Sequence, residues 1–209
     1  MKIFARILIA FFAVGVGFFS LRYLNFEVQG LLHSKAKSLL DNYSYRLAFY
    51  SHVVFGIIAL ITGPFQFFPK LRNRNLHIHR NLGKIYIVAC WIGGLAGFII
   101  AMFATGGIVS TVGFASLAVA WLYTTRMAYW HIRQKNVKEH YRWMVRSFAL
   151  TFAAVTLRIW LPMFTAGFGW AFVPSYRIIS WLAWVPNLLF AEFILRKRAQ
   201  GVRQPEMSA

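Results

Sequence analysis

Four histidines stand in two short basic stretches of the sequence, and their side chains are suited to ligating a cofactor. His77 and His79 belong to the first stretch, and His131 and His140 belong to the second. Bis-histidine ligation of a haem requires one neutral imidazole from each of two facing helices at matched depth. His79 and His140 each stand at the head of an expected helix, so this pair is the candidate for binding haem b. His77 and His79 are two residues apart and point in different directions on a helix.

Lipid binding is the alternative for the same two stretches. All four histidines are expected near the membrane interface, where the propionates of a haem belong but its ring does not. Arg80, Arg142 and Arg146 stand beside them. Arginines and histidines at such an interface also cap helices and bind lipid phosphate. Both interpretations therefore stay open for these stretches.

A third candidate site lies inside the apolar runs, at His52 and Arg158. Polar side chains within a membrane are costly, so each one is a hypothesis for a functional site. Arg158 stands about 22 Å along its run at ~1.5 Å per residue, and His52 stands near the opposite end of its own run, so their depths are similar. We expect one polar cavity here, with further polar groups drawn from Tyr50, Thr62 or Thr156.

The chemistry expected of this cavity follows from the two side chains. Arg158 stays charged and would hold an anion or a carbonyl group. His52 would exchange a proton or bind a ring oxygen, as in a quinone. With His79 and His140, His52 completes the set of histidines considered for cofactor binding. The structural alternative is that Arg158 binds backbone carbonyl groups and holds the helices together.

The elements that carry these side chains are predicted to be transmembrane helices. The chain of 209 residues is 59% hydrophobic and 13% charged, whereas soluble domains are about a quarter charged. A spanning helix needs about 20 apolar residues to cross ~30 Å of hydrocarbon. Six runs meet this requirement, which predicts an all-α membrane bundle: 3–21, 45–68, 84–104, 108–130, 143–166 and 176–195.

The six runs are expected to form a single transmembrane domain spanning 1–209. Residues 1–44 hold a first helix and an external connection with a short surface helix, 45–195 form a five-helix core, and 196–209 form a tail. Lys2 and Arg6 would also suit a signal peptide, but no small-x-small cleavage site follows, so we expect an uncleaved helix. The basic stretch 77–86 is interpreted as a hinge, 131–142 as a loop and 167–175 as a short loop.

Lysines and arginines gather on one side of the predicted bundle. That side collects Lys2, Arg6, Lys70, Arg72, Arg74, Arg80, Lys84, Arg126, Arg133, Lys135, Lys138, Arg142, Arg146, Arg196, Lys197, Arg198 and Arg203. The positive-inside rule then predicts cytoplasmic termini, in the inner membrane of a bacterium. The net charge of +18 would suggest nucleic acid in a soluble protein. Here the basic residues lie between spans, so anionic lipid head groups are the expected partner and nucleic acid is not.

Smaller features predict how the helices pack. Gly63-Pro64 is expected to kink or end the second helix. Gln66 and Asn187 are expected to form hydrogen bonds between helices, and Glu192 is expected to be neutralised by Arg196 one turn later. The single cysteine, Cys90, provides no cysteine-based metal site.

Four motifs in order resemble a bacterial family of predicted membrane proteins, the domain of unknown function 2306. The motifs are His52, then His79-Arg80-x-x-Gly83-x-x-Tyr86, then His140-x-Arg142-Trp143-Met144-x-Arg146-Ser147, then Thr156-Leu157-Arg158. The resemblance covers roughly 46–195 and implies a multi-helix membrane protein with no established activity. The architecture is also similar to that of small b-type membrane cytochromes and some oxidase-assembly proteins. Tyr86 joins the ligand-binding candidates because it stands in the second motif.

Three functions remain open from the sequence. The first, which we favour here, is a redox or redox-assembly protein that binds haem or quinone. The second is a carrier, or a protein that binds a lipid or small anion through Arg158. The third is a non-catalytic subunit of a membrane complex. The chain contains no phosphate-binding glycine loop, HExxH or CxxC motif.

Overall fold

The computed structural model describes residues 3–25 and 35–203, with the side chains of 25 and 201–203 left out, and every regular element in these ranges is a helix. Six stretches are long and apolar enough to cross a membrane. They are Ile3–Leu24, Tyr43–Phe65, Leu76–Ala101, Ile108–Arg133, Val137–Gly167 and Phe172–Gln200. The prediction of an all-α membrane protein with six spanning helices is therefore confirmed.

The helices follow one another with short connections. In chain order they are α1 (Ile3–Ser20), η1 (Leu21–Asn25), α2 (Lys37–Leu40), α3 (Tyr43–Thr62), η3 (Pro64–Phe67), α4 (Pro69–Arg74), α5 (Leu76–Ala101), α6 (Ile108–Arg133), α7 (Val137–Thr151), α8 (Ala153–Pro162), η4 (Met163–Gly167), α9 (Phe172–Leu182) and α10 (Val185–Arg203). The short helix α2 lies in the connection where a short surface helix is expected from the sequence.

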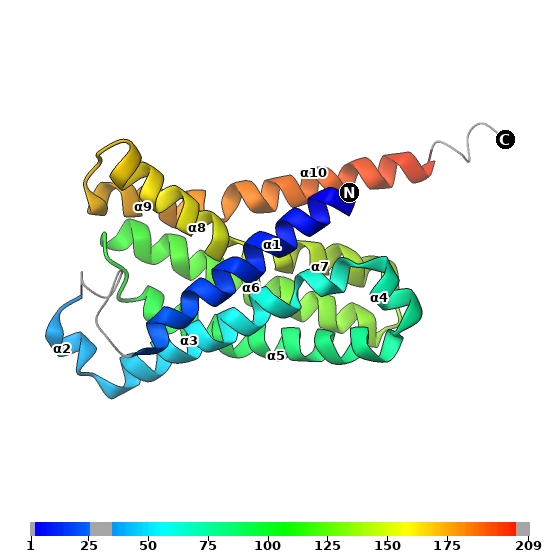
Figure 1. Ribbon diagram of the computed structural model, residues 1–209, viewed down its shortest axis with the longest axis horizontal. Helices are drawn as coiled ribbons and strands as arrows, with labels where there is room; N and C mark the ends of the chain where they lie inside the picture. The colour runs from blue at the N-terminus through cyan, green and yellow to red at the C-terminus, as the bar shows by residue number, and fades with distance from the viewer. Residues whose placement is uncertain (1–2, 26–34, 204–209) are drawn as a thin grey trace.

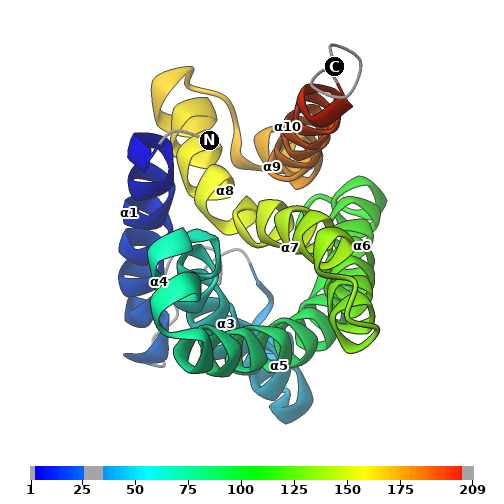
Figure 2. The ribbon, with the colours of Figure 1, turned by 90° about the vertical axis from the view of Figure 1, so that its right-hand side faces the viewer.

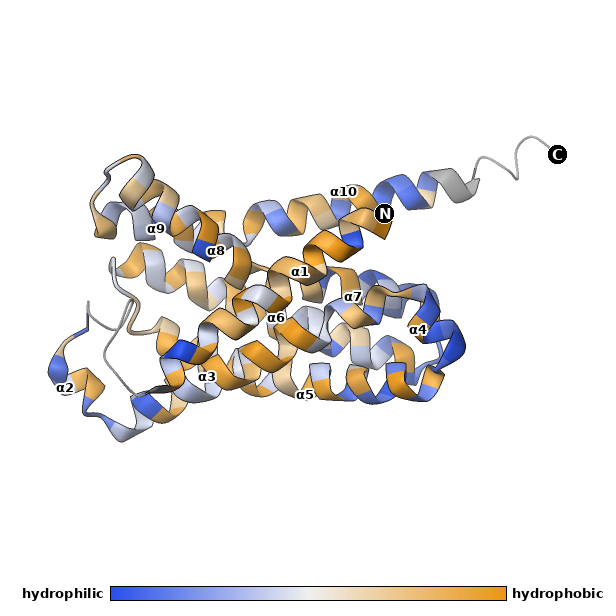
Figure 3. Ribbon diagram, viewed as in Figure 1, coloured by the Kyte–Doolittle hydropathy of each residue, from blue (hydrophilic) through white to orange (hydrophobic). Residues whose placement is uncertain are grey.

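Helices α3, α5, α6 and α7 lie side by side in that order, and α1 packs across α3 (Figures 1 and 2). Helix α10 packs on α7 and α9. One end of the bundle holds α4, the α6–α7 turn and the end of α10, and it is strongly hydrophilic (Figure 3); we call it the basic end. The other end holds α2 and the α5–α6 turn, and we call it the opposite end.

The two basic stretches are helical, which corrects the predictions of a hinge and a long loop. Helix α5 begins at Leu76, so the expected hinge at 77–86 forms its first turns. Helix α6 continues to Arg133 and α7 begins at Val137, with the Asn136 side chain accepting a hydrogen bond from the Glu139 amide at 3.1 Å. Long basic side chains reach polar surroundings from within a helix. The charge pattern therefore marks the edge of the apolar region and not the end of the helix.

The predicted interruption at Gly63-Pro64 is confirmed. Helix α3 ends at Thr62, and the 3₁₀ turn η3 begins at Pro64. A Cβ atom on Gly63 would lie 2.6 Å from the ring of Phe148. Only glycine therefore allows this part of the chain to approach α7 so closely.

The fifth and sixth spans are each divided into two helices, which is not expected from the sequence. The breaks lie at Phe152 and at Ala183-Trp184. The Thr156 hydroxyl donates to the Ala183 carbonyl at 2.5 Å, and the Asn187 amide donates to the Thr156 hydroxyl at 3.1 Å and to the Ala149 carbonyl at 3.3 Å. Polar side chains thus bind backbone groups at the breaks, and the predicted interhelical role of Asn187 is confirmed.

Candidate functional site

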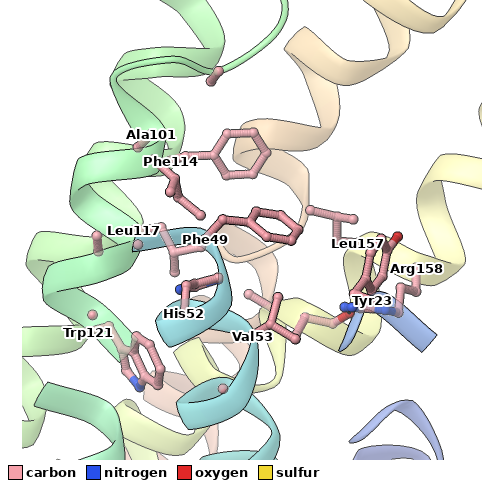
Figure 4. A pocket seen from close by; sticks show the side chains of 18 of the residues that line it. Tyr23, Phe49, His52, Val53, Ala101, Phe114, Leu117, Trp121, Leu157 and Arg158 are labelled. Carbon is pink, nitrogen blue, oxygen red and sulfur yellow. The ribbon is translucent and has the colours of Figure 1, made fainter. Parts of the chain in front are cut away.

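A cavity of about 230 Å³ lies inside the bundle, between α3, α5, α6 and α8 (Figure 4). We call it the His52–Arg158 cavity because both side chains line it. Its walls are mainly apolar and aromatic, with Phe49, Phe114 and Trp121 among them. Lys35 and the α5–α6 turn also line it, so it extends toward the opposite end of the bundle. His52 and Arg158 therefore line one cavity, as expected, but its walls are mainly apolar, whereas a polar cavity was expected.

His52 is held in a defined orientation on α3. Its Nδ1 lies 2.8 Å from the carbonyl oxygen of Gly93 on α5. A Cβ atom at Gly97 would come within 2.8 Å of the same Nδ1, so glycine at this position is what admits the ring. Because a carbonyl group only accepts hydrogen bonds, Nδ1 carries the proton. In the neutral ring, Nε2 then has a free lone pair for a ligand hydroxyl.

Both terminal nitrogens of the Arg158 guanidinium group donate hydrogen bonds within the protein. It donates through Nη1 to the Ala154 carbonyl at 2.9 Å and through Nη2 to the Ser20 hydroxyl of α1 at 2.8 Å. Arginine has five N–H donors, so three remain beyond these two contacts. Among the described residues, the ion pairs involve other arginines and leave Arg158 without a carboxylate. The residue therefore ties α8 to α1 and also keeps its charge available.

The polar groups lie on two sides of the cavity. Figure 4 shows Arg158 beside Tyr23 on one side and His52 near Trp121 on the other, with Phe49 and Val53 drawn between them. A ligand that binds both groups must therefore lie along an aromatic and aliphatic wall. Of the further groups expected from the sequence, Thr62 and Thr156 bond to backbone carbonyl groups, and neither they nor Tyr50 line this cavity.

Lys35 is a cavity residue that the sequence did not indicate. It belongs to the segment before α3, outside the apolar runs, and it donates to the carbonyl of Phe103 near the α5–α6 turn. Partial burial lowers the pKa of Lys35 below its ordinary value. The cavity thus has a second cation at its end, and none of the described residues that line it is acidic. No sequence signal would have found Lys35, because the fold and not the spacing brings it here.

A buried polar network extends from the cavity wall, where Trp121 and Thr151 line the cavity, into the packing of α5, α6 and α7. The Tyr86 hydroxyl shares hydrogen bonds with those of Ser147 and Thr151, each at 2.9 Å. Thr125 shares a hydrogen bond with Ser147 at 2.7 Å, and the Trp121 indole donates to Thr151 at 2.9 Å. Tyr86 is completely buried and does not line the cavity. Tyr86, which the sequence suggested as a ligand contact, therefore packs between α5, α6 and α7.

His79 on α5 and His140 on α7 both lie near the basic end, where positive charges on the two rings would repel one another. His140 Nδ1 lies 2.8 Å from the Ala128 carbonyl. The side-chain amide of Gln66 is oriented so that its nitrogen donates to His79 Nδ1 at 3.2 Å and its oxygen accepts from the Gly83 backbone amide at 3.3 Å. Gln66 thus links η3 to α5, as expected from the sequence. Neither histidine lines the His52–Arg158 cavity, which is also too small for a haem, since sites for drug-sized ligands measure about 300–1,000 Å³.

The three basic-stretch arginines considered as ligand contacts differ in their surroundings. Arg142 pairs with Glu139 at 2.7 Å. Arg146 binds both oxygens of Glu192, at 2.5 and 3.1 Å, and lies over the ring of Trp143. Arg196, which was expected to neutralise Glu192, interacts with it electrostatically, while the hydrogen-bonded partner is Arg146. Arg80 is exposed on the first turns of α5.

Residues 49–195 match the model of a family described as predicted membrane protein, DUF2306. The chain belongs to this family. The match includes His52, Arg158 and the whole of α5 to α9, whereas Lys35 and Ser20, the α1 residue that Arg158 contacts, lie before it. No curated protein and no solved structure matches the chain. The DUF2306 match supports the family resemblance and assigns no activity.

Proposed function

We propose that this DUF2306 protein binds a small amphiphile with an anionic head group in the His52–Arg158 cavity. The observation that carries the proposal is the charge of the lining: Arg158 and Lys35 face an apolar space with no acidic side chain among the described lining residues. An unpaired cation in such surroundings is costly, and an anion would offset that cost. The apolar walls would hold the hydrocarbon part of the same molecule.

The size of the cavity limits the ligand. A volume of about 230 Å³ is below the range of about 300–1,000 Å³ for sites that enclose drug-sized molecules. A short acyl chain or a single substituted ring fits this limit, and a diacyl lipid does not. The head group would contact the free N–H donors of Arg158, and the tail would lie along Phe49 and Val53.

A quinol is the second candidate, and the orientation of His52 favours it. The free lone pair on Nε2 accepts a hydrogen bond from a ligand hydroxyl, while Arg158 donates to an oxygen of the same ring. A quinol in this cavity would agree with the redox function that the sequence favours. Haem binding by His79 and His140 is the weaker proposal, because these rings line neither the His52–Arg158 cavity nor the larger one described below.

Binding of decanoate, decanol and a short-chain ubiquinol to the purified protein in nanodiscs tests the proposal. We expect decanoate to bind more tightly than decanol, and Arg158→Gln to weaken decanoate at least tenfold, because a hydrogen bond to a charged group contributes about 1.5–3 kcal/mol. Arg126→Gln is the control, since Arg126 is exposed and lies outside the cavity. Equal binding of decanol would contradict anion recognition, and a preference for ubiquinol would favour the second candidate.

The side of the membrane that each end faces also stays a proposal. We propose that the basic end faces the cytoplasm of a bacterial cell, because Lys and Arg gather there. The His52–Arg158 cavity would then extend toward the outer surface. Labelling of a cysteine introduced at Lys37 by a membrane-impermeant maleimide in intact cells would support this orientation, and protection of that cysteine would contradict it.

A further inference from the structure

A second and larger cavity lies at the basic end, outside the site described above. It measures about 610 Å³. Its lining residues come from α1, η3, α4, α7 and α10, and we call it the α1–α10 groove. Figure 2 views the bundle from this end and shows α1 and α10 on opposite sides of the space in front of α7 and α8. The groove therefore lies between two helices at the periphery of the bundle.

The body of the groove is apolar. Phe67, Phe148, Phe152 and Phe190 provide aromatic surfaces, and smaller aliphatic side chains such as Ala149 fill the space between them. A volume of about 610 Å³ lies within the range of about 300–1,000 Å³ that encloses medium-sized ligands. The groove can therefore hold a substantial length of hydrocarbon chain.

Three arginines line the groove, one from each of three helices that are distant in the sequence. They are Arg6 of α1, Arg72 of α4 and Arg198 of α10. None of the described residues that line the groove is acidic. Arg198 donates to the Tyr141 hydroxyl at 2.5 Å and lies over its ring, which positions a cation without neutralising it. The Arg72 guanidinium group makes a long contact of 3.5 Å with the side chain of the neighbouring Asn73, which is uncharged.

This arrangement differs from an ordinary basic surface at the membrane edge. Arg142 and Arg146 at the same end are paired with carboxylates. The three groove arginines have no ion pair among the described residues, and they line one and the same apolar space, which is large enough for a hydrocarbon chain. Guanidinium groups bind phosphate oxygens through planar pairs of N–H donors. The complementary molecule carries a phosphate and a hydrocarbon chain together.

We propose that the α1–α10 groove is a binding site for an anionic phospholipid of the adjacent leaflet. The phosphate lies among Arg6, Arg72 and Arg198, and one acyl chain lies against Ala149 and the phenylalanines of α7 and α10. A lipid bound in this way fills the space between α1 and α10. The site is separate from the His52–Arg158 cavity, and it does not depend on the function proposed for that cavity.

The test compares retention of phosphatidylglycerol and phosphatidylcholine by the protein after detergent exchange, measured by native mass spectrometry. We expect phosphatidylglycerol to be retained in preference. A juxtamembrane basic residue contributes about 1 kcal/mol to binding an anionic surface, which is about fivefold in affinity. The combined substitution Arg6→Gln, Arg72→Gln and Arg198→Gln should therefore reduce retention at least tenfold.

Two further variants distinguish specific lipid binding in the groove from nonspecific electrostatic attraction of anionic lipid to the basic end. Arg74→Gln, Arg126→Gln and Arg133→Gln together remove the same charge from the basic end without touching the groove, and they should leave retention within twofold. Ala149→Phe fills the groove and should reduce retention with every arginine in place. Equal loss in both triple variants, or unchanged retention in a folded Ala149→Phe protein, would overturn the proposal. Displacement of the lipid by millimolar inorganic phosphate would identify a site for free phosphate instead.

Discussion

One region of the molecule, between α5, α6 and α7, holds polar groups that bind one another, whereas the arginines that face the two cavities have no described carboxylate partner. In the first region, Tyr86, Ser147 and Thr151 form a network, of which Thr151 also lines the His52–Arg158 cavity. In the second, Arg158 contacts a backbone carbonyl and a serine hydroxyl but no described carboxylate. The comparison separates a polar side chain that stabilises helix packing from one that is available to a ligand. Burial alone does not make this distinction, because both kinds lie within the spanning helices.

The largest expected effect concerns the network around Tyr86. Tyr86→Ala should lower the free energy of unfolding by about 3–5 kcal/mol, as for other large buried aromatic side chains. Tyr86→Phe removes only the hydroxyl and should cost about 1 kcal/mol. Tyr43→Ala is the control, because Tyr43 is 77% exposed. Unfolding in mixed detergent micelles measures these changes. Weaker decanoate binding in a stably folded Tyr86→Phe protein would show that the Tyr86 hydroxyl contributes to ligand binding and not only to stability.

The next effect concerns the position of His52. Gly97→Ala would place a Cβ atom 2.8 Å from His52 Nδ1, so the ring must move, and binding of the short-chain ubiquinol, whose hydroxyl would donate to Nε2, should weaken by about tenfold. Gly93→Ala is the matched control on the same helix, since its nearest contact would be an ordinary 3.4 Å to Phe55. Equal loss in the two variants would mean that helix packing, and not the ring of His52, controls binding.

The smallest effect is the pH dependence from Lys35. Because burial lowers the pKa of Lys35 from 10.5, its positive charge is lost at a lower pH than in an exposed lysine. Decanoate remains ionised in this range and Arg158 remains charged, so affinity should fall severalfold as the pH rises from 7 toward 10. Lys35→Gln should bind more weakly at pH 7 and show a flatter profile. An affinity that rises with pH, or an unchanged slope in the variant, would contradict a role for Lys35.

The sequence predicts the helices well because hydropathy over about 20 residues is a strong signal. It also brings His52 and Arg158 to one cavity, since depth follows from position along a helix. It misses the breaks at Phe152 and Ala183-Trp184, where hydrogen bonds from Thr156 and Asn187 bind backbone groups. The local pattern around these residues does not reveal those contacts, because they join neighbouring helices.

The charged partners were less predictable than the helices. Arg196 stands one turn from Glu192, which is the usual spacing of a helical ion pair, yet the hydrogen-bonded partner is Arg146 on α7. Lys35 reaches the cavity from a polar connection. Both contacts depend on how distant segments pack, and a single sequence contains little information about that packing.

Photo-cross-linking with a decanoate analogue that carries a terminal diazirine tests the proposed anion site most directly. Peptide mapping after irradiation identifies the residues that the tail contacts. We predict labels on cavity-lining residues of α3, α6 and α8, competed by excess decanoate and reduced by Arg158→Gln. Labels spread evenly over lipid-facing residues such as Leu95 and Val119, and unchanged by Arg158→Gln, would contradict the proposal that this cavity binds an anionic amphiphile.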